Sequence, residues 1–434
     1  MKINNRKVLR TKIKNILNNK LFADSFVYVL TDIINASLPY FLLPILTYYI
    51  TPNQYGKLAV FNSLVSVLIV LIGQGIINLL SVNFYKNDKS KFKKFVFNML
   101  LIINIASVLM FLCILIFKDF INIQSSLDYK WFIVSLVLSY FNLISSLYLT
   151  ILILERKPKI FGIFQISVTL IKFAFSLLFV VYLLLSWKGR IFGILIGSII
   201  AGLVALHFII KKYIVFILDK RIIKEIIFFY IPLIPHQLSG WLKSGITILL
   251  LANMDSNTSA GLYDVAMKFV MPISIIAISL NKAWIPNLYS KLSKKPSFEE
   301  KKQIVKFIYM FFLIFILLAI IIIILSPLVA KIIFEKSYFN AIKFIVPLAL
   351  GTVITSMFPF FIAFIYYTKK VKYISLITLG TAILSVLLTY AFLKSNVKLG
   401  PAYAFLITAI ISTFCTFIYS QIVYPMPWFL YKKQ

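Results

Sequence analysis

Long apolar stretches separated by short polar links dominate this chain. Twelve stretches are long enough for a helix to cross a bilayer, which takes about 20 residues. The longest link, near 291–303, is too small for a soluble catalytic domain. The pattern predicts an all-α polytopic membrane protein whose first span is permanent, because that stretch is too long for a cleaved signal peptide. The twelve predicted spans are 24–50, 57–84, 94–117, 131–154, 160–186, 191–210, 222–252, 260–289, 304–328, 339–366, 373–393 and 399–424.

The positive charges alternate along the links. With the N-terminus in the cytoplasm, 31 of the 45 Lys and Arg residues lie at cytoplasmic ends, nine at outer ends and five inside spans. This bias obeys the positive-inside rule and predicts that both termini are cytoplasmic. It also accounts for most of the net charge of +32 without a nucleic-acid partner, because the lysines lie between spans rather than on one basic domain. Composition agrees, since 61% apolar and 13% charged residues exclude an ordinary soluble protein.

The two halves of the chain resemble each other at an offset of about 205 positions. Thr51–Gly56 after the first span matches Ser256–Gly261 after the seventh, and Asn83–Lys86 matches Asn287–Lys291. An even number of spans per half predicts two six-helix lobes related by a parallel repeat, which is a transporter architecture. The predicted organisation is a basic N-terminus (1–23), an N-lobe (24–210), a linker (211–221), a C-lobe (222–424) and a short C-terminus (425–434).

Ionisable side chains inside the spans indicate function, because each costs about 2.5–3.5 kcal/mol on insertion scales. Lys343 lies close to an outer end, where a snorkelling anchor is the simpler interpretation. The remaining cations outnumber the two deep acids, so at least two positive charges lack a carboxylate. They predict a water-filled cationic cavity between the lobes for a ligand with concentrated negative charge, such as a pyrophosphate. The proposed pyrophosphate contacts are Lys172, Lys243, Lys268 and Lys282.

The two deep acids, Asp32 and Asp264, are candidates for binding a coupling ion. Asp32 could instead form a structural ion pair with one of the buried lysines. With two His residues in the chain and no His/Cys cluster, we expect neither a metal site nor a cofactor.

Polar side chains accompany the lysines at helical spacing. Gln165 shares a face with Lys172 in the fifth span, and Asn35 shares one with Asp32 in the first. These residues are candidate substrate contacts, although such side chains also join membrane helices by hydrogen bonds. His236 is a further candidate in the seventh span, with a hydrogen bond near the helix kink as the alternative.

Trp241 could stack on a sugar ring, or it could serve packing or interfacial anchoring. Prolines and a glycine weaken two of the spans and predict hinges. Static kinks that only shape packing are the alternative. The hinge candidates are Pro39, Pro44, Pro232, Pro235 and Gly240.

Several segments resemble one protein family. The run Leu38–Thr47 followed by Thr51–Gly56 is similar to the opening of Wzx-type flippases, which belong to the multidrug/oligosaccharidyl-lipid/polysaccharide exporter superfamily. Leu238–Trp241, Gly261–Ala266 and Lys398–Ala404 fit the same pattern, and the resemblance spans nearly the whole chain.

The resemblance implies a function without covalent chemistry. Such proteins move undecaprenyl-pyrophosphate-linked sugar repeat units from the cytoplasmic to the outer leaflet of the bacterial inner membrane, for O-antigen or capsule. They alternate access, coupled to an ion gradient, with membrane lipid and other polysaccharide-assembly proteins as partners. Family members often carry an Asp-Arg pair in the seventh span, where this chain has only the cation Lys243. This departure weakens the ion-coupling scheme for that span.

Two other functions fit the membrane topology. A membrane-embedded polysaccharide polymerase or transferase usually needs a sizeable outer loop with acidic or Arg catalytic groups, and the outer links here are short. A small-molecule cation or drug antiporter of the same superfamily prefers an acidic cavity, whereas the predicted cavity is cationic.

Overall fold

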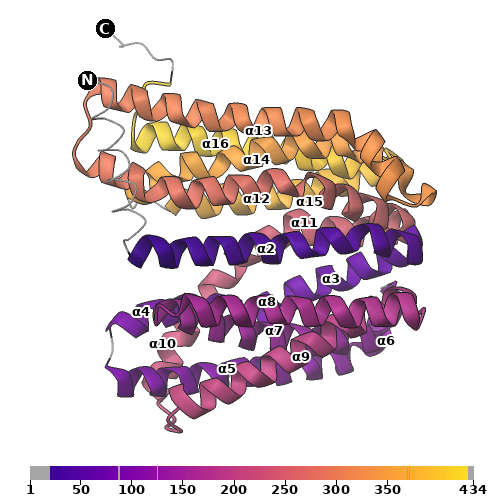
Figure 1. Cartoon of the computed structure of the whole chain (residues 1–434), viewed down its shortest axis with the longest axis horizontal. Coiled ribbons are helices and arrows are strands. Elements are labelled where there is room, and N and C mark those ends of the chain that lie inside the picture. Colours follow the sequence, from indigo (N-terminus) through magenta and orange to yellow (C-terminus); the bar gives the residue numbers. More distant parts are fainter. Residues whose placement is uncertain (1–19, 87, 125, 369, 371, 429–434) are drawn as a thin grey trace, which may run out of the picture. The chain divides into compact units, whose positions relative to one another are not determined.

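The structure is a computed structural model, and it describes residues 20–86, 88–124, 126–368, 370 and 372–428 (Figure 1). Every regular element in this part of the chain is a helix, so the all-α prediction is confirmed. The helices are α2 (Lys20–Tyr49), α3 (Pro52–Ile72), η1 (Gln74–Ile76), α4 (Ile77–Lys86), α5 (Lys89–Ile116), α6 (Lys118–Gln124), α7 (Tyr129–Leu154), α8 (Pro158–Leu177), η2 (Leu178–Tyr182), α9 (Ser186–Tyr213), α10 (Lys220–Tyr230), η3 (Ile231–Leu233), α11 (Ile234–Met254), α12 (Asn257–Ser293), α13 (Phe298–Ile333), η4 (Lys336–Ala341), α14 (Ile342–Tyr367), α15 (Lys372–Lys394) and α16 (Gly400–Val423).

Each predicted span corresponds to one long helix or to a run of consecutive helical segments. Within the described residues, ten helices are long and apolar enough to cross a membrane. The first and seventh predicted spans add α2 and the run α10–η3–α11, which makes twelve. The chain is therefore a multi-pass membrane protein, as the hydrophobic pattern predicts.

Two spans are interrupted, one at a glycine with positive φ and one at a proline. In the second, Gly73 has φ 139°, and the short helix η1 separates α3 from α4. In the seventh, η3 separates α10 from α11, and Pro232 within it has no N–H to continue the helical hydrogen bonds. By contrast, α2 continues as one helix through Pro44. Prolines therefore coincide with a break in the seventh span but not in the first.

The helices form two compact units. Unit 1 contains the described residues up to Leu43 together with Leu68–Ile116 and Ile133–Ile231. Unit 2 contains Pro44–Val67, Phe117–Phe132 and the described residues from Pro232 onward. The lobes 24–210 and 222–424 remain a prediction from the internal repeat, because these units are defined by packing alone.

In unit 1, α8 and α9 pack closely along a line of glycines. A Cβ added to Gly193 would lie 2.5 Å from the backbone nitrogen of Ser176, so only glycine allows this approach. Tyr148 of α7 stacks on Phe208 of α9, with ring centroids 5.7 Å apart. These contacts hold the helices that carry the polar residues of unit 1.

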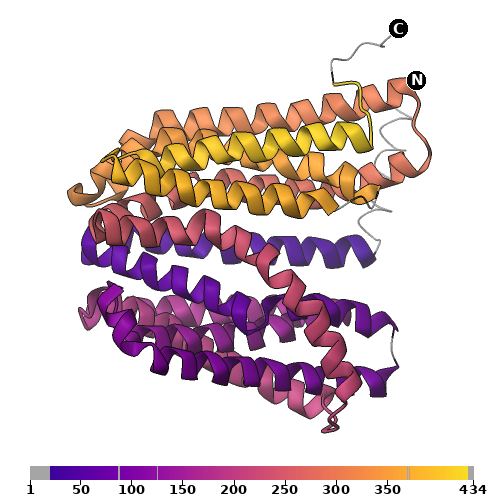
Figure 2. The ribbon, with the colours of Figure 1, turned by 180° about the vertical axis from the view of Figure 1, so that it is seen from behind.

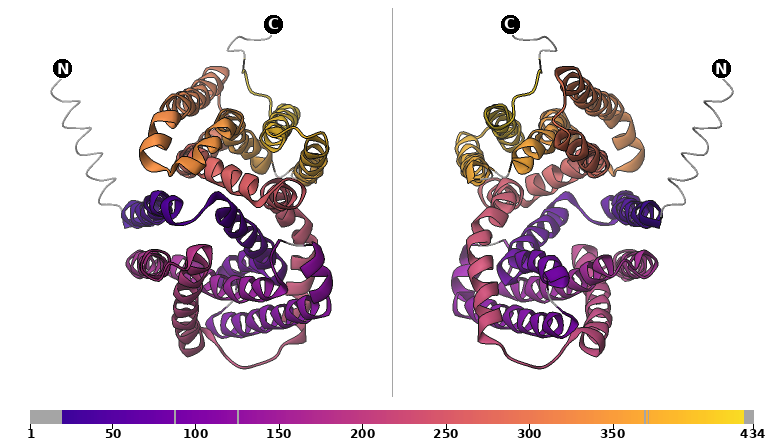
Figure 3. Two further views of the ribbon diagram at one scale, coloured as in Figure 1. Left: turned by 90° about the vertical axis from the view of Figure 1, so that its right-hand side faces the viewer. Right: turned by 90° about the vertical axis from the view of Figure 1, so that its left-hand side faces the viewer.

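In unit 2, α14 is the most buried helix and packs against α12, α13 and α16. Seen from behind, α15 and α16 lie side by side (Figure 2), and Figure 3 shows the C-terminal helices of this unit, orange to yellow, end-on. Phe360 and Phe364 are fully buried in its core. Trp428, beyond α16, packs its ring against Phe361 and Phe417 at 5.4 and 5.5 Å.

The two matching motifs of the repeat meet inside unit 2. A Cβ on Gly56 would lie 1.7 Å from the carbonyl oxygen of Asn257, and one on Gly261 would lie 2.2 Å from that of Pro52. Pro52 and Gly56 are the repeat partners of Asn257 and Gly261 at an offset of 205. Such a reciprocal contact is what a local two-fold axis between equivalent segments generates. The internal repeat is therefore compatible with the packing at its most distinct motif.

Candidate functional site

Lys268 of α12 is one of the intramembrane lysines and has an acidic partner. Its Nζ donates to Oδ2 of Asp264, one turn earlier, at 2.5 Å and to the hydroxyl of Tyr55 at 2.8 Å. The same nitrogen lies 4.8 Å from the centroid of the Tyr55 ring. Carboxylate, hydroxyl and ring face together compensate this charge, so Lys268 is neutralised within unit 2.

Tyr55 is held rigidly for this contact. It is 1% exposed, and its ring meets that of Tyr338 edge-on at 6.0 Å. The Tyr338 hydroxyl in turn donates to the carbonyl oxygen of Ile50, at the end of α2. The arrangement joins α3, α12 and η4 around the Asp264–Lys268 pair.

Lys243 of α11 lies in a different environment, a cavity of about 230 Å³ within unit 2. Its Nζ donates to Oγ of Ser412 at 3.4 Å, and among the described residues no carboxylate lies within 4 Å of it. The lining of this cavity is rich in hydroxyl groups, which come from α11, α14, α15 and α16. The hydroxyl residues are Ser239, Thr355, Thr378, Thr408, Ser412 and Thr413.

Lys172 of α8 is an intramembrane lysine of unit 1. Its Nζ donates to Oδ1 of Asn142 at 3.1 Å, and Ser198 donates to the same oxygen at 3.0 Å. Its side chain packs against Gly197 of α9, where a Cβ would lie 2.5 Å from the lysine Cγ. Within the part of the chain that the structure describes, Lys172 forms no ion pair. It is thus a second intramembrane cation held by neutral oxygens.

Asn35 and Gln165 belong to a contact between α2 and α8 of unit 1. The Thr169 hydroxyl donates to Oδ1 of Asn35 and to the carbonyl oxygen of Gln165. Thr169 lies three residues before Lys172, so this contact shares a helix face with that lysine.

Trp241 has a structural partner. Its indole Nε1 donates to the carbonyl oxygen and the hydroxyl of Ser63 in α3, at 3.0 and 3.1 Å. Ser63 also donates to the carbonyl oxygen of Gly245 at 2.9 Å. The indole N–H is therefore occupied by protein in this structure, and stacking of the ring on a sugar stays a prediction. Gly240, one residue earlier, faces open space and lines the cavity of Lys243.

The side chains of four other predicted site or hinge residues lie outside the described part of the structure: Asp32, Pro39, His236 and Lys282. Lys343 is exposed near the start of α14. Pro235 lies in the first turn of α11, directly after the break at η3.

The sequence interpretation missed the hydroxyl groups around Lys243 that come from α14–α16. A signal for them was present, because Thr408, Ser412 and Thr416 follow each other at four-residue spacing in α16. Thr378 of α15 also had a signal, because Ser375, Thr381 and Ser385 lie three or seven positions from it in the same helix. In chemical terms, Lys243 and these hydroxyls can bind an anionic, hydroxyl-bearing ligand. Among the described residues no group of His, Cys, Asp or Glu could hold a metal ion.

Comparison with known proteins identifies the family. Residues 21–293, more than half of the chain, match the family described as "Polysaccharide biosynthesis protein". The chain is 23% identical over 293 residues to "Lsg locus putative protein 1" of Haemophilus influenzae, covering 64% of this chain and 68% of that protein.

Solved structures show the same fold. The lipid II flippase MurJ in an inward closed conformation is 15% identical, with a TM-score of 0.70 over 92% of this chain and 87% of that chain. A MATE protein in complex with MaD3S is 13% identical, with a TM-score of 0.62 over 91% and 94%. The resemblance to Wzx-type flippases is thereby confirmed at the level of family and fold. The chain belongs to the polysaccharide biosynthesis protein family, and it has the multi-pass helical fold of MATE proteins and MurJ.

Proposed function

We propose that this protein is a flippase for undecaprenyl-pyrophosphate-linked oligosaccharide repeat units. It moves them from the cytoplasmic to the outer leaflet of a bacterial inner membrane by alternating access, for O-antigen or capsule assembly. The observation that carries the proposal is the state of Lys172 and Lys243. Each is an ammonium group within a span, and among the described residues it donates to a neutral oxygen and forms no ion pair. Without a mobile anion or water such charges are costly, so they favour a substrate with a concentrated negative charge.

The proposed roles follow from the contacts. Lys172 and Lys243 are each a proposed contact for the pyrophosphate, which lysine binds as a point charge. The hydroxyl-rich wall around Lys243 suits the sugars, because hydroxyl groups both donate and accept hydrogen bonds. Lys282 stays a proposed contact.

Lys268 has a modified role in this proposal, because its partner Asp264 already compensates its charge. The pair can release its ammonium to a pyrophosphate only if Asp264 gains another cation or a proton. We therefore place Asp264 and Lys268 together as the candidate ion-coupling site of unit 2, with Asp32 as the second candidate acid. The breaks at Pro232 and Pro235 are the proposed hinge of the same unit, and Pro39 and Pro44 are the proposed hinge of α2.

Deletion of the gene tests this proposal. We expect the undecaprenyl-pyrophosphate-linked repeat unit to accumulate in the cytoplasmic leaflet, and surface glycan to be lost. Accumulation of single repeat units in the outer leaflet would instead identify a polymerase. Intact surface glycan with increased drug sensitivity would identify an antiporter. Both of these outcomes would overturn the flippase assignment.

A further inference from the structure

A basic cavity of about 450 Å³ opens at one end of unit 1, where α4, α7 and α9 end and α5 begins. Its size is in the range of small-molecule sites. The positive-inside rule assigns this end of the helices to the cytoplasmic side. Three lysines, one glutamate and two phenylalanines define its chemistry: Lys89, Lys93, Lys212, Glu155, Phe84 and Phe92.

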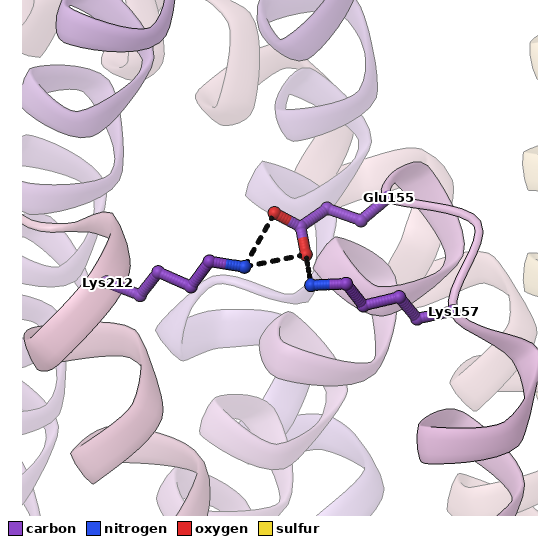
Figure 4. Close-up of polar contacts among 3 residues, drawn as sticks. All are labelled: Glu155, Lys157 and Lys212. Carbon is purple, nitrogen blue, oxygen red and sulfur yellow. Dashed lines mark hydrogen bonds and ion pairs between the residues drawn. The ribbon is translucent and has the colours of Figure 1, made fainter.

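Glu155 is fully engaged by lysines and does not neutralise the rest of the cavity. Its carboxylate lies between two ammonium groups (Figure 4). The Nζ of Lys157 is 2.5 Å from Oε2, and that of Lys212 is 3.2 Å from both carboxylate oxygens. Burial alone would raise the pKa of Glu155, but hydrogen bonds from Lys157, Tyr213 and Lys212 hold that pKa below its ordinary value. The three charges form a clasp between the ends of α7 and α9.

Lys89 and Lys93 supply positive charge that no described carboxylate offsets by an ion pair. They lie one turn apart in the first two turns of α5, and both line the cavity. Among the described residues, neither side chain forms an ion pair or a hydrogen bond. Beside them, Phe84 and Phe92 meet edge-on at 5.2 Å and give the cavity an apolar wall. The cavity thus combines two available ammonium groups with an aromatic surface.

Topology alone does not account for this arrangement. The positive-inside rule explains why lysines gather at this end, and Lys91 of the same helix is an exposed example. It does not explain why Lys89 and Lys93 line a cavity with an aromatic wall, whereas Lys91, between them in the sequence, does not. A phosphate headgroup with an attached chain is complementary to both features, since lysine binds phosphate and the rings accept apolar groups.

We infer that this cavity binds the phosphate group of a membrane-lipid headgroup through Lys89 and Lys93, with the apolar part of the lipid against Phe84 and Phe92. Basic pockets between the cytoplasmic ends of membrane helices are suited to such headgroups. Two lipids carry this chemistry, an anionic phospholipid and a polyprenyl diphosphate. The inference does not rest on transport, because binding to the cavity requires no movement between leaflets.

Lipid binding to the full-length protein in detergent, measured by native mass spectrometry, tests the inference. The probes are phosphatidylglycerol, phosphatidylcholine and undecaprenyl diphosphate, each alone and in competition. We expect both anionic lipids to outcompete phosphatidylcholine, whose choline group cancels the charge of its phosphate. The double variant Lys89→Gln/Lys93→Gln should lose at least about tenfold in affinity for them. The lipid that displaces the other identifies the preferred ligand.

Matched variants keep the test specific. Lys91→Gln/Lys220→Gln removes the same charge from two exposed positions outside the cavity and should leave binding unchanged. Lys89→Arg/Lys93→Arg keeps the charge and should retain binding. The inference is overturned if the control loses as much affinity as Lys89→Gln/Lys93→Gln, or if the wild-type protein does not distinguish the anionic lipids from phosphatidylcholine. It is also overturned if inorganic phosphate displaces the lipids at equal concentration, because the site would then take a free anion.

Discussion

At the scale of single residues, the intramembrane lysines fall into two classes. Lys268 has a carboxylate, a hydroxyl and a ring face as partners, whereas Lys172 and Lys243 contact neutral oxygens and form no ion pair within the described part of the chain. A paired charge mainly contributes to structure, because removing its partner exposes the cost of burial. An unpaired charge keeps its full attraction for an anionic ligand. The two classes therefore predict different consequences of substitution.

Replacing Lys243 by Gln should abolish surface glycan while the protein inserts normally. Gln retains a hydrogen bond to Ser412 but has no charge for a pyrophosphate, so transport fails without a packing defect. Lys343→Gln is the matched control, because that lysine is exposed. Immunoblotting of membranes and glycan staining of cells measure the two quantities. Normal glycan in the Lys243→Gln strain would remove this lysine from the mechanism.

Asp264→Leu should destabilise unit 2 by about 1–3 kcal/mol, because it leaves the ammonium of Lys268 without its carboxylate. The double variant Asp264→Leu/Lys268→Met should recover most of that loss, since replacing an ion pair by apolar residues is often nearly neutral. Thermal unfolding in detergent checks both. If the double variant loses as much stability as Asp264→Leu and Lys268→Met lose together, the two residues do not act as a pair.

The Glu155 clasp predicts a pH dependence outside the membrane spans. Because the folded state lowers the pKa of Glu155, the clasp stabilises the protein above the ordinary carboxyl range. This stabilisation is lost as the pH falls through the lowered folded pKa. Its size is at most about 1 kcal/mol, because Lys212 is half exposed.

Comparison with Glu155→Gln measures this contribution. The wild-type protein should unfold at a higher temperature than the variant at pH 7, and the gap should close as the pH falls below about 4. A gap that is equally wide at both pH values would show that the charge of Glu155 does not contribute.

At the scale of helices, the close contact between the two repeat motifs predicts that neither Gly56 nor Gly261 tolerates a larger side chain. Gly56→Ala places a methyl group where the carbonyl oxygen of Asn257 lies, and Gly261→Ala does the same at Pro52. Each should destabilise the protein by about 1–3 kcal/mol, because backbone has to move. Gly380→Ala is the control, since nothing lies within 4 Å of its added Cβ. Unchanged unfolding temperatures for both repeat variants would contradict this packing.

The hydrophobic pattern was sufficient to locate the helices, because a membrane helix needs about 20 apolar residues and the links here are short. It was less informative about their interruptions. Pro232 and Pro235 marked the break at η3 by their chemistry. The break at Gly73 had a weaker signal, the sequence Gly73-Gln74-Gly75, because glycine is also frequent in unbroken membrane helices.

At the scale of the whole molecule, the sequence could show which charges lie inside spans but not which of them are paired. Asp264 and Lys268 lie four positions apart on one helix, so their pairing could have been read from spacing, although the sequence interpretation gave them separate roles. The contribution of Tyr55 is a tertiary contact between residues 213 positions apart and could not be read from either helix. The same holds for the hydroxyls around Lys243, which come from four helices. Spacing within a helix predicts faces, whereas packing decides which faces meet.

Transbilayer movement of the proposed substrate by the purified protein is the most direct test of the flippase assignment. Proteoliposomes containing the full-length chain and a fluorescent polyprenyl-diphosphate-linked oligosaccharide report how much substrate becomes accessible to an added quencher on the opposite side. The wild-type protein should speed this movement strongly over protein-free vesicles, and Lys243→Gln should reduce it towards that background. The account is contradicted if correctly inserted wild-type protein leaves the rate at the level of protein-free vesicles.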